Sequence, residues 1–194
     1  MVDGERDGLR ERKKRRTWHA IRDAAIRLID ERGFDAVSVD EIAAAAGVSR
    51  STLFNYFASK EAVVLDPDPD EPEVWRALMR ARPAGEPLWD ALRAVQLGYL
   101  EAVGDRLPVQ KRLKASSPKL AESTRELSEQ FAGELLDFAV SRVPDGVEAL
   151  LTYNVVRATV GTAYSTWSID DGIDRLLEIA RDCFDRAGRG FAPD

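Results

Sequence analysis

Two short helical segments joined by a single glycine constrain the fold of this chain more than any other feature of its sequence. Ser38 and Glu41 stand three residues apart at the start of SVDEIAAAAG, which is the spacing of a capping box at the start of a helix. Gly47 follows as a stop signal, and Ser49 is placed to cap a further helix over residues 50–57. The sequence therefore predicts two short helices that meet at a tight turn.

The second short helix has one apolar face and one polar face. Leu53 and Phe57 lie four residues apart and so share the face that packs inward, against a longer helix expected over residues 9–32. A pair of helices of this kind is typical of a helix-turn-helix, whose second helix enters the major groove of DNA. Side chains that can hydrogen-bond to base edges and phosphates occupy the other face: Arg50, Ser51, Thr52, Asn55 and Tyr56.

Helical spacing of apolar residues continues along the rest of the chain. Ser59 is placed to cap a helix that begins at Lys60, and further helices are expected over residues 72–80, 87–103, 118–143, 147–168 and 172–186. No useful length of the sequence alternates apolar and polar residues as a half-buried strand does. We therefore expect an all-α fold.

The segment DPDPDEP separates an N-terminal from a C-terminal domain. Pro67 and Pro69 have no amide hydrogen to donate, and each disfavours helix at the residue before it. The helix from Lys60 should therefore be short. We expect a DNA-binding domain over residues 1–65 and a second helical domain over residues 66–194.

Composition argues against several other classes of protein. Hydrophobic residues make up 44% of the 194 and charged residues 32%, as in globular rather than disordered chains. No apolar run approaches the roughly 20 residues that cross a bilayer. Cys183 is the only cysteine and His19 the only histidine, which leaves little material for a disulfide, a metal site or nucleophilic catalysis. We expect a cytoplasmic protein that is not an enzyme, with no cofactor, no metal and no membrane partner.

Basic residues gather near the N-terminus although the chain is acidic. The net charge is −6, yet residues 1–60 hold 12 Lys and Arg against 10 Asp and Glu. A basic arm lies within residues 10–16, and its candidate contacts to the DNA backbone are Arg12, Lys13, Lys14, Arg15 and Arg16. A helical arm would lie near phosphates, an unstructured arm could enter the minor groove, and a merely solubilising charge run is the alternative.

The stretch RGFDAVSVDEIAAAAGVSRSTLFNYFASKEA resembles the DNA-binding domain of the tetracycline-repressor (TetR) family of regulators, and the likeness extends over about residues 14–64. The helix-turn-helix motif occupies about residues 38–57. The resemblance implies a three-helix DNA-binding domain, a homodimer, and an all-helical C-terminal domain that binds a small molecule and pairs the two subunits.

The resemblance also implies roles for individual positions. Ser38 and Lys60, each at the start of a helix, would contact phosphates. The groove-facing start of the recognition helix would hold Arg50, Ser51 and Thr52, and its groove- and backbone-facing end Phe54, Asn55 and Tyr56. Arginine is suited to guanine and asparagine to adenine.

The C-terminal region offers candidates for a ligand site. Its aromatic residues either line a pocket or fill a helical bundle, and the candidates are Trp75, Trp89, Tyr99, Phe131, Tyr153 and Trp167. The stretch RLKASSPKL, together with the DPDPDEP linker, resembles a subgroup of TetR regulators with acyl-CoA-like ligands, in which Arg112 would meet a phosphate or carboxylate. We expect a small apolar or acyl-chain-like effector.

The apolar stretch ALLTYNVVRATVGTAYSTW is the candidate subunit interface. Its small residues Ala158, Gly161 and Thr162 would let helices approach closely, and a four-helix contact would form with residues 172–186 across a two-fold axis.

The expected function is a ligand-responsive repressor that binds a palindromic operator as a homodimer. The alternatives are a transcriptional activator or co-regulator, and a helical small-molecule-binding protein without repressor activity.

Overall fold

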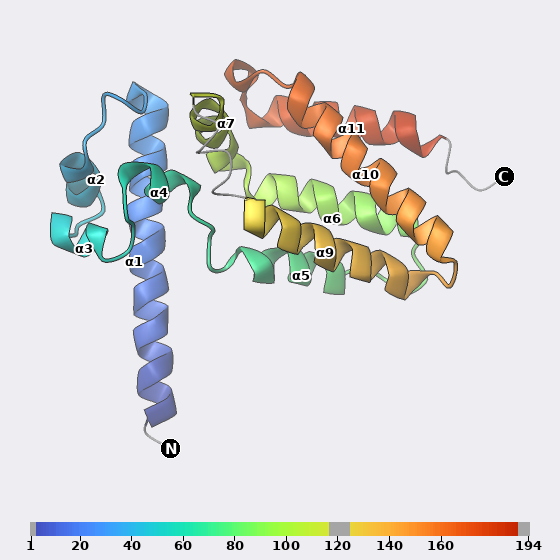
Figure 1. The fold of residues 1–194 in the computed structure, drawn as a ribbon, viewed down its shortest axis with the longest axis horizontal. Helices are drawn as coiled ribbons and strands as arrows, with labels where there is room; N and C mark the ends of the chain where they lie inside the picture. Colours follow the sequence, from blue (N-terminus) through green and yellow to red (C-terminus); the bar gives the residue numbers. More distant parts are fainter. Residues whose placement is uncertain (1–2, 117–124, 190–194) are drawn as a thin grey trace. The chain divides into compact units, whose positions relative to one another are not determined.

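The computed structural model describes residues 3–116 and 125–189, and over these residues it contains helices and no strand (Figure 1). The predicted all-α fold is confirmed. The chain divides into two compact units: the first holds residues up to Pro69 and the segment from Val109, and the second holds residues 70–108 and those from Arg125 onward. None of the described helices combines the length and the apolar character needed to cross a membrane.

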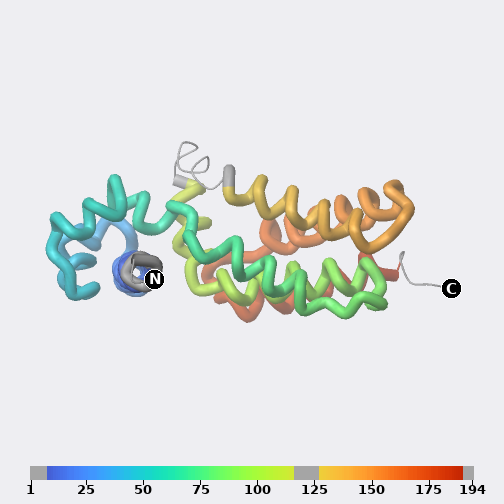
Figure 2. Tube along the Cα trace, turned by 90° about the horizontal axis from the view of Figure 1, so that it is seen from below, coloured from blue at the N-terminus to red at the C-terminus, as the bar shows by residue number. Residues whose placement is uncertain are grey.

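The first unit is built around one long helix. Its elements are α1 (Asp3–Arg32), α2 (Val39–Ala45), α3 (Arg50–Phe54), α4 (Lys60–Leu65) and the greater part of α7 (Leu107–Ser116). Figure 2 looks along α1 and shows α2, α3 and α4 gathered to one side of it. Each helix contributes to a single core, in which fully buried side chains include Ile21, Ile42, Leu53, Val64 and Val109.

Local signals place the starts of the two short helices and the turn between them where the sequence predicts them. Ser38 and Glu41 form both hydrogen bonds of the capping box at the start of α2. Gly47 has a φ of +67°, a left-handed conformation that glycine adopts without steric cost. The Ser49 hydroxyl accepts a hydrogen bond from the backbone N–H of Thr52, 3.0 Å away, at the start of α3.

Helix α3 ends at Phe54, three residues before the predicted end. The backbone N–H of Tyr56 bonds to the carbonyl of Leu53 three residues back, at 3.0 Å, and tightens the last turn. Phe57 nevertheless stays buried, so the polar face of the segment keeps its outward direction.

The linker begins as the two prolines predict. Helix α4 stops at Leu65, and Asp66 has an extended ψ of 143°. Asp68 Oδ1 lies 3.2 Å from Nε2 of His19 on α1, which ties this part of the linker to the first unit. The division between units falls between Pro69 and Asp70, a few residues beyond the expected boundary at 65.

The second unit is a bundle of five longer helices. They are α5 (Glu71–Arg80), α6 (Leu88–Ala102), α9 (Arg125–Arg142), α10 (Gly146–Thr166) and α11 (Gly172–Gly188), with the short 3-10 turns η1 (Gly104–Arg106) and η2 (Ile169–Asp171). Each long helix sends at least one fully buried side chain into a shared core, and examples from the five helices are Trp75, Leu92, Leu135, Val156 and Phe184.

Helix α7 was not predicted from the sequence. Its residues Val109 and Leu113 are buried in the core of the first unit, and the carboxamide of Gln110 donates a hydrogen bond to the carbonyl of Val64 at 3.0 Å. A segment expected in the C-terminal domain therefore packs with the N-terminal helices. The helix expected from residue 118 begins at Arg125 in the structure, and residues 117–124 lie outside the described part of the chain.

Candidate nucleic-acid interface and ligand cavity

The outward face of α3 is set by two buried anchors. Leu53 is 0% and Phe57 1% exposed, and the Phe57 ring lies 5.4 Å from the ring of Trp18 on α1. With these side chains held inward, most of the predicted contact residues are accessible: Arg50, Ser51, Phe54 and Asn55 are exposed, whereas Thr52 and Tyr56 are half-buried. The structure thus places the predicted recognition residues on α3 and on the turn that directly follows it.

Arg50 is held by two neighbours on this face. Its Nη1 donates a hydrogen bond to Oδ2 of Asp40 on α2 at 2.8 Å, and its guanidinium lies 5.4 Å from the centre of the Phe54 ring. Phe54 is 42% exposed, which is unusual for a large apolar side chain. Because both members of the Arg50–Asp40 pair are well exposed, the pair contributes little stability, and Arg50 can exchange Asp40 for another partner.

Ser38 is engaged as a helix cap. Its hydroxyl donates to Glu41 Oε2 at 2.7 Å and accepts from the backbone N–H of Glu41 at 3.2 Å. The pKa of Glu41 is lowered to about 2, chiefly by the backbone N–H of Ser38, then by the Ser38 hydroxyl and by Arg32. This carboxylate therefore stays charged at neutral pH, and the start of α2 is firmly fixed.

Lys60 has a structural partner that the sequence did not reveal. Its Nζ donates hydrogen bonds to the carbonyl oxygens of Phe34 and Val37, at 2.9 and 3.1 Å, and lies 3.9 Å from the centre of the Phe34 ring. These contacts hold the turn between α1 and α2. Both acceptors are more than twenty residues away in the sequence, so no local pattern indicated them.

The basic arm is part of α1. All side chains from Arg10 to Arg16 are exposed, and Figure 1 shows the first turns of α1 extending beyond α2, α3 and α4. The segment is therefore helical in the structure, and its contact with DNA stays a prediction. Its exposed cations belong to the same unit as the helix-turn-helix.

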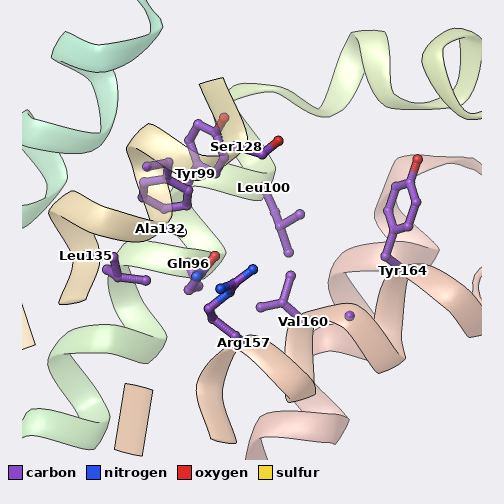
Figure 3. Close-up of a pocket in the computed structure, with 11 residues that line it drawn as sticks. Gln96, Tyr99, Leu100, Ser128, Ala132, Leu135, Arg157, Val160 and Tyr164 are labelled. Carbon is purple, nitrogen blue, oxygen red and sulfur yellow. The ribbon is translucent and has the colours of Figure 1, made fainter. Parts of the chain in front are cut away.

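The second unit forms a cavity of about 490 Å³ that is partly open to solvent (Figure 3). It is lined by residues of α6, α9 and α10: Gln96, Tyr99, Leu100, Ser128, Phe131, Ala132, Leu135, Arg157, Val160, Gly161 and Tyr164. Of the seven predicted ligand residues, Tyr99 and Phe131 line this cavity. Gln96 and Arg157 were not predicted from the sequence, because helical spacing alone does not show which helices face each other.

The other predicted ligand residues lie elsewhere. Trp75, Tyr153 and Trp167 are buried in the core of the second unit, at 0%, 6% and 2% exposure. Trp89 is half-buried, with its ring 5.8 Å from that of Phe184. Arg112 belongs to the first unit, where its Nη1 lies 3.4 Å from Oδ1 of Asp30.

Tyr99 connects the cavity to a buried ion pair. Its ring lines the cavity, and its hydroxyl donates a hydrogen bond to Oε1 of Glu71 at the start of α5. The other carboxylate oxygen of Glu71 pairs with the guanidinium of Arg106. Burial, and then the negative charge of Glu71, raise the pKa of the Tyr99 hydroxyl far above its usual value, so it remains a donor.

Comparisons with known proteins bear on the first unit and on the whole chain. A family model described as "Bacterial regulatory proteins, tetR family" matches residues 21–66. MftR of Mycobacterium tuberculosis, named for the regulation of mycofactocin biosynthesis, is 30% identical over 186 residues that cover 93% of each chain. The transcriptional regulator TcmR of Streptomyces glaucescens is 37% identical over 150 residues, covering 73% of this chain and 66% of TcmR.

Solved structures share the fold at lower identity. The fatty acid degradation regulator FadR from Bacillus halodurans superposes with a TM-score of 0.64 at 20% identity, covering 88% of this chain and 94% of FadR. FadR from Bacillus subtilis, solved in complex with stearoyl-CoA, has a TM-score of 0.61 at 18% identity, covering 88% of this chain and 97% of that one.

Proposed function

Because the chain belongs to the TetR family of DNA-binding transcriptional regulators, we propose that it is a ligand-responsive repressor that binds a palindromic operator as a homodimer. The observation that carries the proposal is the exposed face of α3, anchored from below by Leu53 and Phe57. Arg50 can donate two hydrogen bonds to guanine, and Asn55 can pair with adenine. The exposed ring of Phe54 can contact a thymine methyl group.

Contacts to the DNA backbone come from the surfaces around α3. Ser51, Thr52 and Tyr56 offer hydroxyl groups to phosphates, and the exposed cations of the basic arm extend the contact along the backbone. Ser38 can donate to a phosphate only by exchanging Glu41, to which its hydroxyl now donates, for that phosphate. Lys60 supports binding by fixing the turn before α2, since two of its three N–H donors are already held by carbonyl oxygens.

The homodimer is proposed to form through α10 with α11. The outer face of α10 carries three exposed apolar side chains, Val147 (74%), Leu150 (48%) and Leu151 (53%). Farther along the helix, Ala158, Gly161 and Thr162 are also exposed and small. A two-fold contact through this face would cover the apolar side chains. It would also give the dimer two recognition helices for two half-sites.

The cavity of the second unit is the proposed effector site. Its volume of about 490 Å³ is within the range of small-molecule pockets, about 300–1,000 Å³. Its walls are largely aliphatic and aromatic, and a protein of the same fold has been solved with stearoyl-CoA. These observations support an apolar or acyl-chain-like effector. We propose further that the protein acts in the cytoplasm and catalyses no reaction.

The Tyr99–Glu71–Arg106 contacts are the proposed route from the cavity. The chain passes between the units after Pro69 and again after Pro108, close to Glu71 and to Arg106. A ligand that displaces the Tyr99 ring would change the hydrogen bond that Tyr99 gives to Glu71. For this to weaken DNA binding, the ligand must prefer the conformation whose half-site spacing does not fit the operator.

A gel shift with DNA from the protein's own promoter region tests the proposal. We expect tight binding to that DNA, weak binding to unrelated DNA, and loss of the difference in Arg50→Ala. A promoter fused to a reporter then separates a repressor from an activator, because deletion of a repressor raises expression. Equal affinity for every DNA would contradict the proposal and favour a small-molecule-binding protein without a regulatory role.

A further inference from the structure

One polar side chain in the cavity lacks a hydrogen-bond partner. Gln96 on α6 is 5% exposed and lines the cavity. No hydrogen bond from its carboxamide to another side chain or to the backbone is found among the residues that the structure describes. Its polar atoms are within reach of the water in the cavity rather than sealed off from it. The position therefore suits a ligand that supplies the missing partner.

Arg157 on α10 is the only charged side chain among the described residues that line this cavity. Its Nη1 donates to the Tyr153 hydroxyl at 3.1 Å, and its guanidinium lies 5.6 Å from the centre of the Tyr153 ring. These contacts orient the guanidinium, which has five N–H donors and so keeps donors beyond that single bond. In Figure 3 the guanidinium points toward the part of the cavity where Gln96 lies.

We propose that the effector is an amphipathic carboxylic acid whose carboxylate accepts hydrogen bonds from Arg157 and Gln96. The proposal rests on the proposed function and names the chemistry of its ligand. A carboxylate has two oxygens that accept from a guanidinium and from a carboxamide at once. Its single negative charge matches the positive charge of Arg157, the one charged side chain that the described residues contribute to the cavity. The apolar body of the acid lies against Phe131, Leu135 and Val160, which line the same cavity.

The charge of the cavity also disfavours an acyl-CoA as the preferred ligand. Coenzyme A carries several phosphate charges, and a site for it needs several cations. Among the residues that the structure describes, Arg157 is the one cation that lines the cavity. Arg112, which the sequence suggested for this role, lies in the first unit beside Asp30. The free acid should therefore bind more tightly than its thioester.

Calorimetric titration of the full-length protein tests the headgroup. The probes are octanoate, decanoate and 1-naphthoate, with decanol as the neutral match for decanoate and decanoyl-CoA as the thioester. We expect at least one acid to bind, and decanoate to bind at least about tenfold more tightly than decanol. That factor is the low end of what a hydrogen bond to a charged group contributes. Failure of all three acids to bind, equal binding of decanoate and decanol, or binding of decanoyl-CoA alone would each overturn the proposal.

Variants test whether Arg157 and Gln96 cause the preference for the acid over the alcohol. Arg157→Gln should bind decanoate and decanol alike, whereas Arg157→Lys should keep part of the preference. Gln96→Leu should weaken decanoate and strengthen decanol. Arg175→Gln is the control, because Arg175 is an exposed arginine of α11 paired with Glu178 at 2.9 Å and does not line the cavity. Thermal unfolding of each variant checks that it is folded. An undiminished acid preference in Arg157→Gln would contradict the assignment.

DNA binding measured on the same samples separates this inference from the proposed function. If decanoate binds through Arg157 but leaves DNA affinity unchanged, the carboxylate site stands and the inducer role fails. If decanoyl-CoA releases DNA while the acids do not bind, the regulator is confirmed as ligand-responsive and the carboxylate site is wrong.

Discussion

Glu71 and Arg106 form a buried ion pair, with side chains only 6% and 12% exposed, next to two of the three places where the chain passes between its units. Glu71 opens α5 directly after the proline-containing linker, and Arg106 ends η1 just before α7. Removing one partner of such a pair leaves a buried charge without compensation. The pair is therefore suited to hold the two connecting segments together within the second unit.

Glu71→Gln should destabilise the protein by about 3 kcal/mol or more, because it leaves the Arg106 charge buried and unpaired. Urea unfolding measures this loss. The matched control is Glu73→Gln on the same helix, whose pair with Arg80 is well exposed and should contribute about 1 kcal/mol or less. Equal losses in the two variants would show that burial of the Glu71 pair has no special effect.

Tyr99→Phe should separate ligand binding from its effect on DNA. The variant keeps the ring that lines the cavity and removes the hydroxyl that donates to Glu71. We expect a stability loss of about 1 kcal/mol, nearly unchanged ligand affinity, and a smaller effect of the ligand on DNA binding. Fluorescence anisotropy of labelled DNA, with and without ligand, measures that effect. If the ligand changes DNA binding as much in Tyr99→Phe as in the wild type, the Tyr99 hydroxyl does not carry the signal from the cavity.

Arg50 and Asp40 should have opposite effects on DNA binding. Arg50→Ala removes a base contact worth about 1–3 kcal/mol of discrimination and should blur sequence preference. Asp40→Asn releases Arg50 from its 2.8 Å partner and removes a negative charge near DNA, so it should raise affinity. Anisotropy against operator and unrelated DNA tests both changes. Weaker operator binding in Asp40→Asn would mean that the ion pair positions Arg50 for DNA.

The basic arm should determine part of the salt dependence. Replacing Lys13 and Lys14 with Gln removes two exposed cations and should reduce the slope of log affinity against log salt by about 1.8, or about 0.9 per phosphate contact. Lys60→Met is the comparison. It should lower thermal stability, because the carbonyls of Phe34 and Val37 lose their donor, and leave the slope nearly unchanged. A slope that falls only in Lys60→Met would reverse these roles.

The parts of this structure that the sequence predicted depend on local signals. The capping box at Ser38, the left-handed Gly47 and the prolines of the linker act within a few residues of themselves, and the elements they bound appear where expected. Helix α7 was not predicted because LPVQKRLKAS is short and charged. Its two buried residues pack against helices that are far away in the sequence.

The cavity could not be predicted from residue types alone. Its two central polar residues, Gln96 and Arg157, come from helices that meet only in the folded bundle. Trp75 and Trp167 looked like ligand residues because large aromatics suit pockets and cores equally, and burial among other helices decides between the two. The contacts of Lys60 depend in the same way on long-range packing.

The most direct test of the account is a titration of decanoate into the protein with and without bound operator DNA. Linkage is reciprocal, so a ligand that weakens DNA binding must itself bind less tightly to the DNA-bound protein, by the same factor. We predict that bound operator weakens decanoate binding, and that decanoate weakens operator binding, by the same factor of about 5 to 150. Tight decanoate binding of equal affinity in both states would contradict regulation by this ligand, however well it fits the cavity.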